Sequence, residues 1–393
     1  MTMKLHWFLP TSGDSRTVIP MGEAGHQRPP TFEYMQQVAQ VADVMGFDGA
    51  LTPTGTACED SWIVCSSLMA VTKRLKFLVA FRPGFVSPTL AAQQATTFQR
   101  YSGGRLLLNI VTGGNDAEQQ RFGDWLPHDE RYDRTAEFLQ VLRGAWSGEP
   151  FNFDGKYYSV RGAVVGEPPE PAPPIYIGGS SAAADEVAAK HVDVALTWGE
   201  PPEMVVERLA AWRAAAERAG RQLRFGIRLH VITRDRAKDA WAETERFMEL
   251  LDDETLETVQ STLSRSEAVG QQRMLSLHGG RRDRLEVAPN LWAGIGLVRG
   301  GAGTALVGSH EEVADRIQEY HELGFDEFIL SGHPHVEEAY WFGEGVMPIL
   351  RKRGLIPELE GAQAKRQTEH AFLSLYASGE KPETEHGVKA RQG

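Results

Sequence analysis

Residues 75–111 read LKFLVAFRPGFVSPTLAAQQATTFQRYSGGRLLLNIV, in which two short apolar runs flank a longer segment. The runs at 75–81 and 105–111 are largely apolar without strict alternation, which is typical of parallel strands buried on both faces. The segment 89–102 places its apolar residues at helical spacing. This stretch therefore predicts a strand–helix–strand unit with parallel strands.

The same unit recurs along the chain. Apolar runs associated with helical segments lie at 5–9, 47–53, 75–81, 105–111, 174–179, 192–198, 223–232 and 325–332. Eight such units close a (β/α)8 barrel, whereas a doubly wound sheet usually has about five or six and a glycine-rich turn after its first strand. No GxGxxG follows the first run. We therefore predict an α/β fold, a (β/α)8 TIM barrel, over residues 1–356.

Three stretches are longer than ordinary barrel loops: 113–127, 147–173 with its strand-like NFDGKYYSVRG, and 252–308. Insertions of this length are usually lids, interface pieces or binding loops. The polar segment 357–393 predicts a C-terminal extension that packs on another subunit or stays mobile.

Charge and cysteine content restrict the class of protein. Lys and Arg total 41 against 53 Asp and Glu, and this net charge of −12 argues against a nucleic-acid or anionic-membrane partner. The two cysteines, Cys58 and Cys65, lack CxxC spacing, so neither a disulfide framework nor a cysteine-rich zinc site is indicated. No signal-peptide pattern and no run of 18 apolar residues occurs. We expect a cytoplasmic protein without a membrane span.

The strand FGIRLHVI, residues 225–232, carries Arg228 and His230 on one face, because side chains two apart in a strand point the same way. A buried cation is unfavourable unless an anion meets it. That anion is either an interior carboxylate, which makes a structural pair, or a ligand. Placement at the carboxyl end of a barrel strand favours the ligand, since barrel chemistry lies at that end.

Two glycine-containing turns are further candidates. GGSS at 178–181 follows a strand and opens a helix, so it is either a phosphate site at the helix N-terminus or a plain N-cap. VRGGAGTALVG at 298–308 lacks the Lys-Ser/Thr ending of a nucleotide loop. We interpret it as a glycine-rich lid that carries Arg299 as an oxyanion clamp, the alternative being a solvated surface arginine.

Cysteine and histidine offer two more possibilities. Cys58 precedes a helix, where the helix dipole lowers a thiol pKa, although a small buried cysteine is the commoner situation. His333 and His335 together with His230 are of a type that binds zinc. We predict no metal, because no well-placed carboxylate is evident and Pro334 separates two of the histidines.

Twelve motifs occur in chain order between Leu5 and Leu350: WFLPTSGD, LTPTGTACEDSW, RLKFLVAFRPGFVSPT, NIVTGG, HDERYD, IYIGGSS, LTWGEPPE, FGIRLHVI, DDET, VGQQRM, NLWAGIGLVRGGAGTALVG and SGHPHVEEAY. Together they resemble the alkanesulfonate monooxygenases of the bacterial luciferase-like flavin family. The resemblance implies a barrel that takes reduced FMN from a separate NAD(P)H-dependent flavin reductase. With O₂ it cleaves the C–S bond of an organosulfonate to sulfite and an aldehyde. Dimers or tetramers are also implied.

The resemblance also implies roles for individual residues. The cofactor-binding positions are Asn109, Thr112, Tyr132, Gly179, Ser180 and Ser181. The substrate-binding positions are Trp198, Arg228, His230, Arg299, His333 and Ser12. The catalytic positions are Arg228, His230, Arg299, His333 and Cys58.

Two positions depart from the family pattern. Ser12 stands where a histidine is expected, and His333 where a tyrosine is expected. A smaller, more hydrophilic wall and an added donor or acceptor suit a hydroxyl-bearing sulfonate, so sulfoquinovose is the specific substrate expectation.

Four alternatives remain open. They are a simple alkanesulfonate monooxygenase, a deazaflavin-dependent oxidoreductase of the same barrel group, a flavin- or sulfonate-binding protein without turnover, and a metal-dependent barrel hydrolase. Sulfite release from a sulfonate panel separates them.

Overall fold

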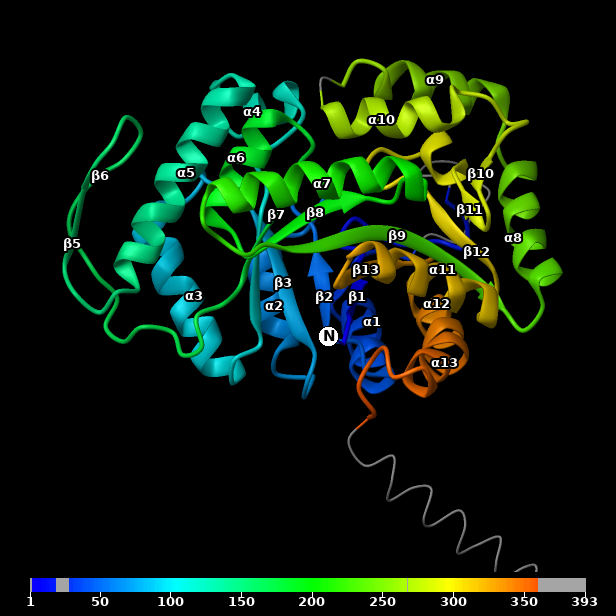
Figure 1. The fold of residues 1–393 in the computed structure, drawn as a ribbon, viewed down its shortest axis with the longest axis horizontal. Helices are drawn as coiled ribbons and strands as arrows, with labels where there is room; N and C mark the ends of the chain where they lie inside the picture. Colours follow the sequence, from blue (N-terminus) through cyan, green and yellow to red (C-terminus); the bar gives the residue numbers. More distant parts are fainter. Residues whose placement is uncertain (1, 19–27, 267, 360–393) are drawn as a thin grey trace, which may run out of the picture. The chain divides into compact units, whose positions relative to one another are not determined.

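Eight parallel strands form a closed ring in the computed structural model, which describes residues 2–18, 28–266 and 268–359 (Figure 1). Neighbours pair in chain order, and the β8–β9 and β13–β1 pairings close the ring. The strands are β1 (Lys4–Phe8), β2 (Gly49–Thr52), β3 (Lys76–Phe81), β4 (Leu106–Ile110), β7 (Ile175–Gly178), β8 (Val194–Trp198), β9 (Arg224–Arg234) and β13 (Glu327–Ser331). Each falls within one of the eight predicted runs or overlaps it, so the predicted barrel is confirmed.

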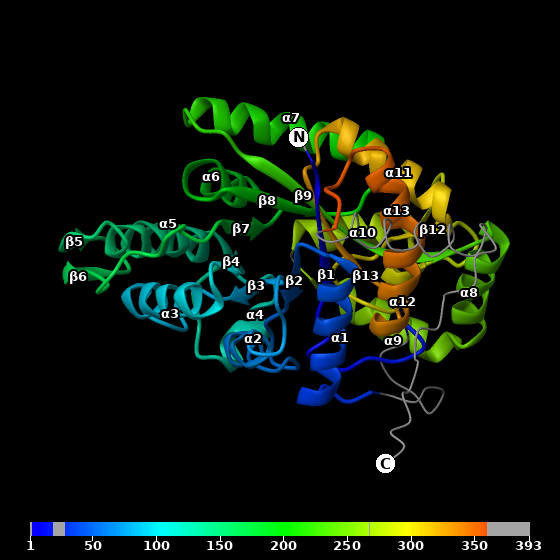
Figure 2. The ribbon, with the colours of Figure 1, turned by 90° about the horizontal axis from the view of Figure 1, so that it is seen from below.

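Helices surround the ring (Figure 2). They are α1 (Phe32–Met45), α2 (Ser61–Leu68), α3 (Pro88–Ser102), α5 (His128–Ala145), α6 (Ala182–His191), α7 (Pro202–Arg218), α8 (Ala237–Glu249), α11 (His310–Leu323), α12 (His335–Trp341) and α13 (Met347–Lys352), with a π-turn, η2 (Phe342–Val346), between the last two. Local signals set their ends. Asp60 caps α2 by accepting from the N–H of Ile63, and α1 ends at Gly46, whose φ of 89° favours glycine.

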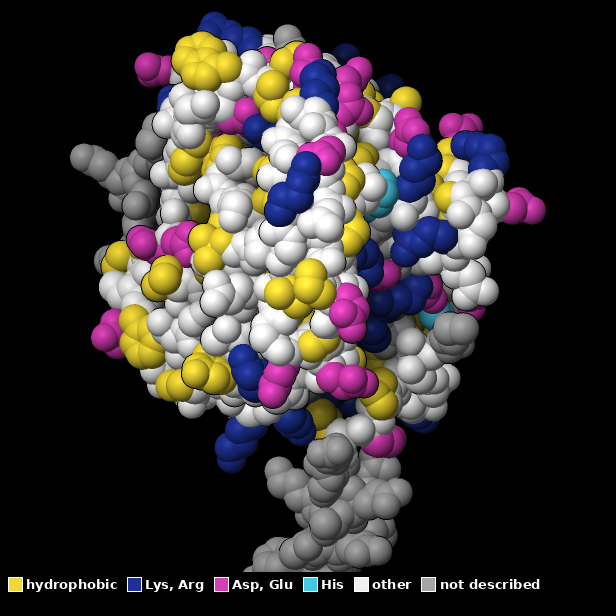
Figure 3. Space-filling model, turned by 90° about the vertical axis from the view of Figure 1, so that its left-hand side faces the viewer, with side chains coloured by type: hydrophobic (Ala, Val, Ile, Leu, Met, Phe, Trp, Pro, Cys, Tyr) yellow, Lys and Arg dark blue, Asp and Glu magenta, His cyan; other side chains and the backbone are white. Residues whose placement is uncertain are grey.

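The insertions contain ordered elements. Residues 113–127 include α4 (Asp116–Arg121), and 147–173 form the antiparallel hairpin of β5 (Phe151–Asp154) and β6 (Ser159–Ala163). The side of the molecule that carries this hairpin shows basic and acidic side chains interspersed (Figure 3).

The third insertion, 252–308, contains more structure than the sequence indicated. It comprises α9 (Asp253–Leu263), α10 (Val269–His278), β10 (Glu286–Ala288), β11 (Leu291–Trp292), η1 (Gly294–Leu297) and β12 (Ala305–Ser309), extending one residue beyond it. Strand β12 pairs in parallel with the second half of β9, from His230 to Arg234. Because β9 is longer than its barrel neighbours, it offers this free edge, and the pairing ties the glycine-rich segment 298–304 to the barrel.

A buried ionic cluster fills the amino-terminal end of the barrel. Glu327 is fully buried and accepts from Tyr176 Oη at 2.7 Å and from Arg224, while His6 Nε2 lies 3.0 Å from it. These contacts lower the pKa of the Glu327 carboxyl to about 2 despite burial, which acts in the opposite direction. Polar groups at this end of a barrel contribute to stability.

The contacts of the chain divide it after Ile356, and residues 357–393 form a second unit. The predicted C-terminal extension lies outside the described residues, apart from 357–359. In the described part of the chain no helix is both long and apolar enough to cross a membrane.

Candidate active site

A cavity of about 380 Å³ opens at the carboxyl ends of the barrel strands, where barrel enzymes carry their chemistry. Its wall includes residues from β4, β7, β8 and β9 and the start of α10. Eight of the predicted site residues line it: Asn109, Thr112, Tyr132, Gly179, Ser180, Ser181, Trp198 and Arg228. The structure thus brings all six predicted cofactor positions together with two predicted substrate positions.

The serine turn at one side of this cavity is rigidly built. Ser181 is the N-cap of α6 and accepts from the N–H of Ala184 at 3.2 Å. The buried Tyr132 side chain is hydrogen-bonded to Ser181 and Thr112, and burial raises the pKa of its phenol. A Cβ on Gly179 would lie 2.9 Å from Tyr132 Oη, so only glycine fits this close approach. The turn is therefore a preformed site at the positive end of a helix.

A brace behind the turn fixes the Gly179 carbonyl. Arg208 on α7 donates to the Gly179 oxygen at 2.7 Å and forms a paired hydrogen bond with Asp185 of α6. Asp185 also accepts from Trp212 Nε1 at 2.9 Å. Sequence reasoning missed this brace, because Arg208 and Asp185 lie on helix faces that carry no motif.

The deep wall carries an unpaired acceptor. Asn109 at the end of β4 is 8% exposed, and its Oδ1 has no hydrogen-bond partner within the described part of the chain. A buried amide oxygen without a partner is unfavourable, so a donor from a ligand in the cavity would satisfy it.

Arg228 has no compensating anion among the residues that the structure describes. Its guanidinium lies 4.1 Å from the centre of the Phe8 ring, its Nε is buried without a hydrogen bond, and no carboxylate of the described residues pairs with it. Burial, together with repulsion by Arg299, lowers the pKa of the guanidinium to about 10. Trp198 is its register partner on β8. Of the two interpretations of this arginine, the structural ion pair is wrong.

The His230 side chain is hydrogen-bonded to other residues of the protein and is not among the residues that line the cavity. Its Nε2 donates to the Ala302 carbonyl at 3.1 Å, and its Nδ1 accepts from the Ser331 hydroxyl at 3.0 Å. Burial and the neighbouring His333 and Arg228 hold its pKa well below the ordinary value. Both nitrogens of a neutral imidazole are therefore occupied, and the substrate contact stays a prediction.

Arg299 is a partly buried donor with a partner inside the protein and not a solvated surface side chain. Its Nη1 donates to His333 Nε2 at 2.9 Å, and burial lowers the pKa of the guanidinium. The His333 ring stacks on the His230 ring with centroids 5.5 Å apart. Burial and the Arg299 charge lower the pKa of His333 to about 3, although the neighbouring Asp14 acts in the opposite direction.

The expectation that no carboxylate is well placed near these histidines is wrong. Asp14 Oδ1 lies 3.5 Å from His333 Nδ1 and 3.0 Å from His335 Nδ1. The three groups offer ligand atoms within 4.8 Å of one another, so they are a geometric candidate for a cation. Asp14 follows β1, and β1 neighbours β13 only because the barrel closes. The predicted closure of the barrel could have revealed this contact, because it places the loop after β1 beside the loop after β13.

Cys58 and Ser12 are not among the residues that line the cavity, although Cys58 is near enough to Arg299 for that charge to act on its thiol. Cys58 precedes the Asp60 N-cap of α2 and so stands outside the first helical turn. Burial raises the pKa of its thiol, so the interpretation as a dipole-activated thiolate is wrong. Ser12 is exposed in the turn after β1. Catalytic or binding roles for both residues stay predictions.

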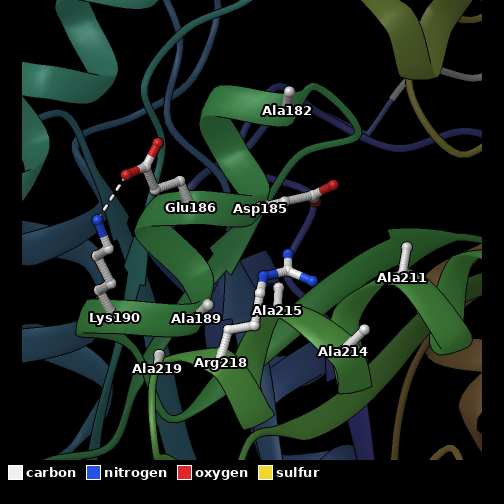
Figure 4. Close-up of a pocket in the computed structure, with 10 residues that line it drawn as sticks. All are labelled: Ala182, Asp185, Glu186, Ala189, Lys190, Ala211, Ala214, Ala215, Arg218 and Ala219. Atoms are coloured by element: carbon white, nitrogen blue, oxygen red, sulfur yellow. Dashed lines mark hydrogen bonds and ion pairs between the residues drawn. The ribbon is translucent and has the colours of Figure 1, made fainter.

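A larger hollow on the outside of the barrel has a different character. It lies between α6 and α7, has a volume of about 610 Å³ and is lined mainly by alanines (Figure 4). Its Lys190 and Glu186 side chains pair with each other at 2.5 Å. No group of reactive side chains converges there, so the barrel mouth is the candidate active site.

Comparison with known proteins agrees with this geometry. The family model described as luciferase-like monooxygenase matches residues 3–327. The chain belongs to the luciferase-like monooxygenase family. Solved structures with low sequence identity to this chain have the same fold. EDTA monooxygenase from Chelativorans sp. BNC1 is 20% identical with a TM-score of 0.73, over 91% of this chain and 95% of the other.

Two further structures show how far the fold of this luciferase-like chain extends. A riboflavin lyase solved with modified FMN and riboflavin is 21% identical with a TM-score of 0.74, over 91% of this chain and 93% of the other. An F420-dependent secondary alcohol dehydrogenase is 18% identical with a TM-score of 0.63, over 89% of this chain and 99% of the other. The fold therefore serves both flavin and deazaflavin chemistry, and the site must decide between them.

Proposed function

We propose that this protein is a two-component monooxygenase that uses reduced FMN and O₂ to cleave the C–S bond of an organosulfonate, releasing sulfite and an aldehyde. The observation that carries the proposal is Arg228, a partly buried cation with no carboxylate partner among the described residues, in the wall of the cavity that also contains the serine turn. A sulfonate is a monoanion with three acceptor oxygens and would supply the missing charge.

The cavity residues fit the flavin. Ser180, Ser181 and the start of α6 offer hydroxyl and backbone donors for its phosphate, and Gly179 keeps the space for it open. The unpaired Asn109 Oδ1 would accept from an N–H of the ring system. Bound reduced flavin would supply the activation of O₂, since no side chain carries that chemistry.

The remaining residues bind and orient the substrate. Arg228 and the indole N–H of Trp198, which is its register partner, would hold the sulfonate oxygens. Arg299 brings a second positive charge close to Arg228, as their mutual repulsion indicates. The glycine-rich segment that carries Arg299 would keep water from the reacting carbon.

We propose a polar sugar sulfonate, such as sulfoquinovose, as the preferred substrate. The support is the sequence departure at Ser12, which is smaller than the ring of the family pattern and exposed, but is not among the residues that line the cavity. His333 supports it less than its sequence position indicates, because its Nε2 accepts from Arg299 and its Nδ1 faces Asp14. A simple alkanesulfonate is the alternative.

The partner proteins belong to the same proposal. A separate NAD(P)H-dependent flavin reductase would deliver reduced FMN in the cytoplasm, and the chain would act as a dimer or tetramer. Co-purification with a reductase and light scattering of the purified chain test these two points.

The deciding experiment measures sulfite. The purified chain is supplied with reduced FMN, O₂ and a panel that contains sulfoquinovose and octanesulfonate. Sulfite from sulfoquinovose alone supports the full proposal, and sulfite from octanesulfonate alone replaces the substrate. If no sulfonate yields sulfite and the chain instead oxidises a secondary alcohol with F420, the deazaflavin alternative holds. Saturable flavin or sulfonate binding without any turnover would indicate a binding protein.

A further inference from the structure

We propose that Asp14 and His333 are positioning residues that fix Arg299 in the closed site: the Asp14 carboxylate orients the His333 ring electrostatically, and the ring accepts a hydrogen bond from the Arg299 guanidinium. Neither residue would touch the reacting atoms. Their function is to hold the arginine of the glycine-rich segment in one orientation before any ligand arrives. The proposal deepens the proposed function, because the same site is concerned, but this arrangement can be measured without turnover.

The first step is the anchoring of Asp14. Its carboxylate accepts from the Tyr34 hydroxyl at 2.5 Å, from the His335 N–H at 2.7 Å and from the Ser15 N–H at 2.8 Å. Together with the facing imidazoles these donors keep it ionised in a buried position. A carboxylate held from three directions cannot rotate away, so its Oδ1 stays directed at the two histidine rings.

The second step is the tautomer of His333. Arg299 offers only donors, so His333 Nε2, 2.9 Å from Nη1, must be the acceptor. The proton of the neutral ring is then on Nδ1, which makes no hydrogen bond within the described residues but faces the charged Asp14 Oδ1 at 3.5 Å. A negative oxygen on that side favours this tautomer over the other. Asp14 therefore keeps the Nε2 lone pair available for Arg299.

The third step is the second attachment of the same segment. His230 Nε2 donates to the Ala302 carbonyl, which requires the opposite tautomer from that of His333. The Gly301 N–H is held independently by Gln271 Oε1 at 2.9 Å. The segment thus has backbone attachments to His230 and α10 and one side-chain attachment to His333. Loss of the His333 attachment frees the Arg299 side chain and loosens the backbone of the segment, which the other two attachments still hold in place.

A cation bound by Asp14, His333 and His335 is the competing interpretation. A metal on His333 Nδ1 would place the remaining ring proton on Nε2, directly against the N–H groups of Arg299. It would also add positive charge beside two arginines that already lack carboxylate partners in the described part of the chain. The observed contact with Arg299 therefore favours the oriented imidazole over the metal.

The test combines ¹⁵N-histidine NMR with hydrogen exchange of the flavin-free protein at neutral pH. We expect a neutral Nδ1–H tautomer for His333 and a neutral Nε2–H tautomer for His230, assigned by single His→Gln variants. In Asp14→Asn the His333 tautomer is expected to change, and amide exchange in residues 299–303 to rise by about tenfold or more, as loss of a charge-assisted hydrogen bond requires.

Two variants separate positioning from general damage. Tyr34→Phe removes another partner of Asp14 and is expected to leave the tautomer and the exchange of 299–303 unchanged. In a His333→Gln background, whose amide oxygen accepts without a tautomer, Asp14→Asn is expected to add no further increase. In the turnover assay Asp14→Asn should raise the sulfonate KM and leave flavin affinity unchanged.

Three results would overturn the proposal: an Nε2–H tautomer for His333, exchange of 299–303 that does not respond to Asp14→Asn, or stoichiometric zinc that His335→Ala removes. The outcomes are distinguishable from failure of the proposed function. A chain that releases no sulfite can still show both tautomers and the exchange response, and a chain that releases sulfite can lack them.

Discussion

Replacing Arg228 by methionine should stabilise the protein while it weakens anion binding. Burial lowers the pKa of this guanidinium from 12.5 to about 10. Because the folded state binds the proton less tightly than the unfolded state does, the charge destabilises the fold at pH 7. The difference corresponds to at most about 3 kcal/mol.

Part of this gain is lost with the contact to the Phe8 ring, which contributes about 1–2 kcal/mol when desolvated. The net expectation for Arg228→Met is a gain of about 1–2 kcal/mol in the free energy of unfolding, or an increase of about 1–3 °C in Tm for a chain of this length. Sulfonate affinity should fall by about 10–100-fold, as the loss of charge-assisted hydrogen bonds implies.

Arg224→Met is the matched control on the same strand. Arg224 pairs with the fully buried Glu327, so its removal leaves a buried carboxylate short of one partner. The free energy of unfolding should fall by about 3 kcal/mol. Sulfonate binding should persist, because Arg224 lies at the opposite end of the barrel. Urea denaturation and calorimetric titration with the sulfonate measure both effects. A destabilised Arg228→Met protein would refute the claim that this charge has no internal partner.

Three further predictions concern other parts of the structure. Gly179→Ala should reduce FMN affinity at least about tenfold, because the added Cβ would lie 2.6 Å from the Ala184 Cβ in the first turn of α6. Gly178→Ala would meet no atom within 4 Å and should leave FMN affinity unchanged. Fluorescence titration with FMN measures both affinities. The pKa of the Glu327 carboxyl is about 2 in the folded state against an ordinary value of 4.5, so its ionisation should stabilise the fold by up to about 3 kcal/mol above pH 4.5. This stabilisation is lost as the pH falls towards 2. In urea denaturation the stability of Glu327→Gln should therefore depend less on pH in this range than that of the wild type, and an equal dependence contradicts the prediction. The closed form of residues 299–303 should become less stable below pH 6.5, because His333 has a pKa of about 3 in the closed form and regains its ordinary pKa when the segment opens. Hydrogen exchange, corrected for the intrinsic rate at each pH, should show this effect in the wild type. It should be absent in His333→Gln.

Some tertiary features were predictable from local pattern. The period of the apolar runs identified the strands β1 to β4, β7 to β9 and β13, since buried parallel strands and amphipathic helices differ in period. The strand β12 escaped notice, because its short run ALVGS follows a glycine-rich segment and has no period of its own. Its assignment needed the free edge of β9.

The candidate site divides in the same way. The turn at 178–181 could be located because a strand end, small residues and a helix start are adjacent in the chain. The spatial neighbours of Asp14 could not be located in this way. His333 and His335 follow the last barrel strand, and they come close to Asp14 only across the β13–β1 pairing. His230 shows the same limit, since its position at a strand end is local but its partner Ala302 is not.

The sequence by itself determined the number of strand–helix units, and with it the closed barrel, because periodicity is a property of neighbouring residues. It also determined that Arg228 and His230 share a face of one strand. Only the tertiary structure decided that Arg228 has no carboxylate partner in the part of the chain that is described, while Arg299 reaches Asp14 through an imidazole. The physical reason is that charge compensation depends on distances between segments far apart in the chain, which ring closure sets and local pattern does not.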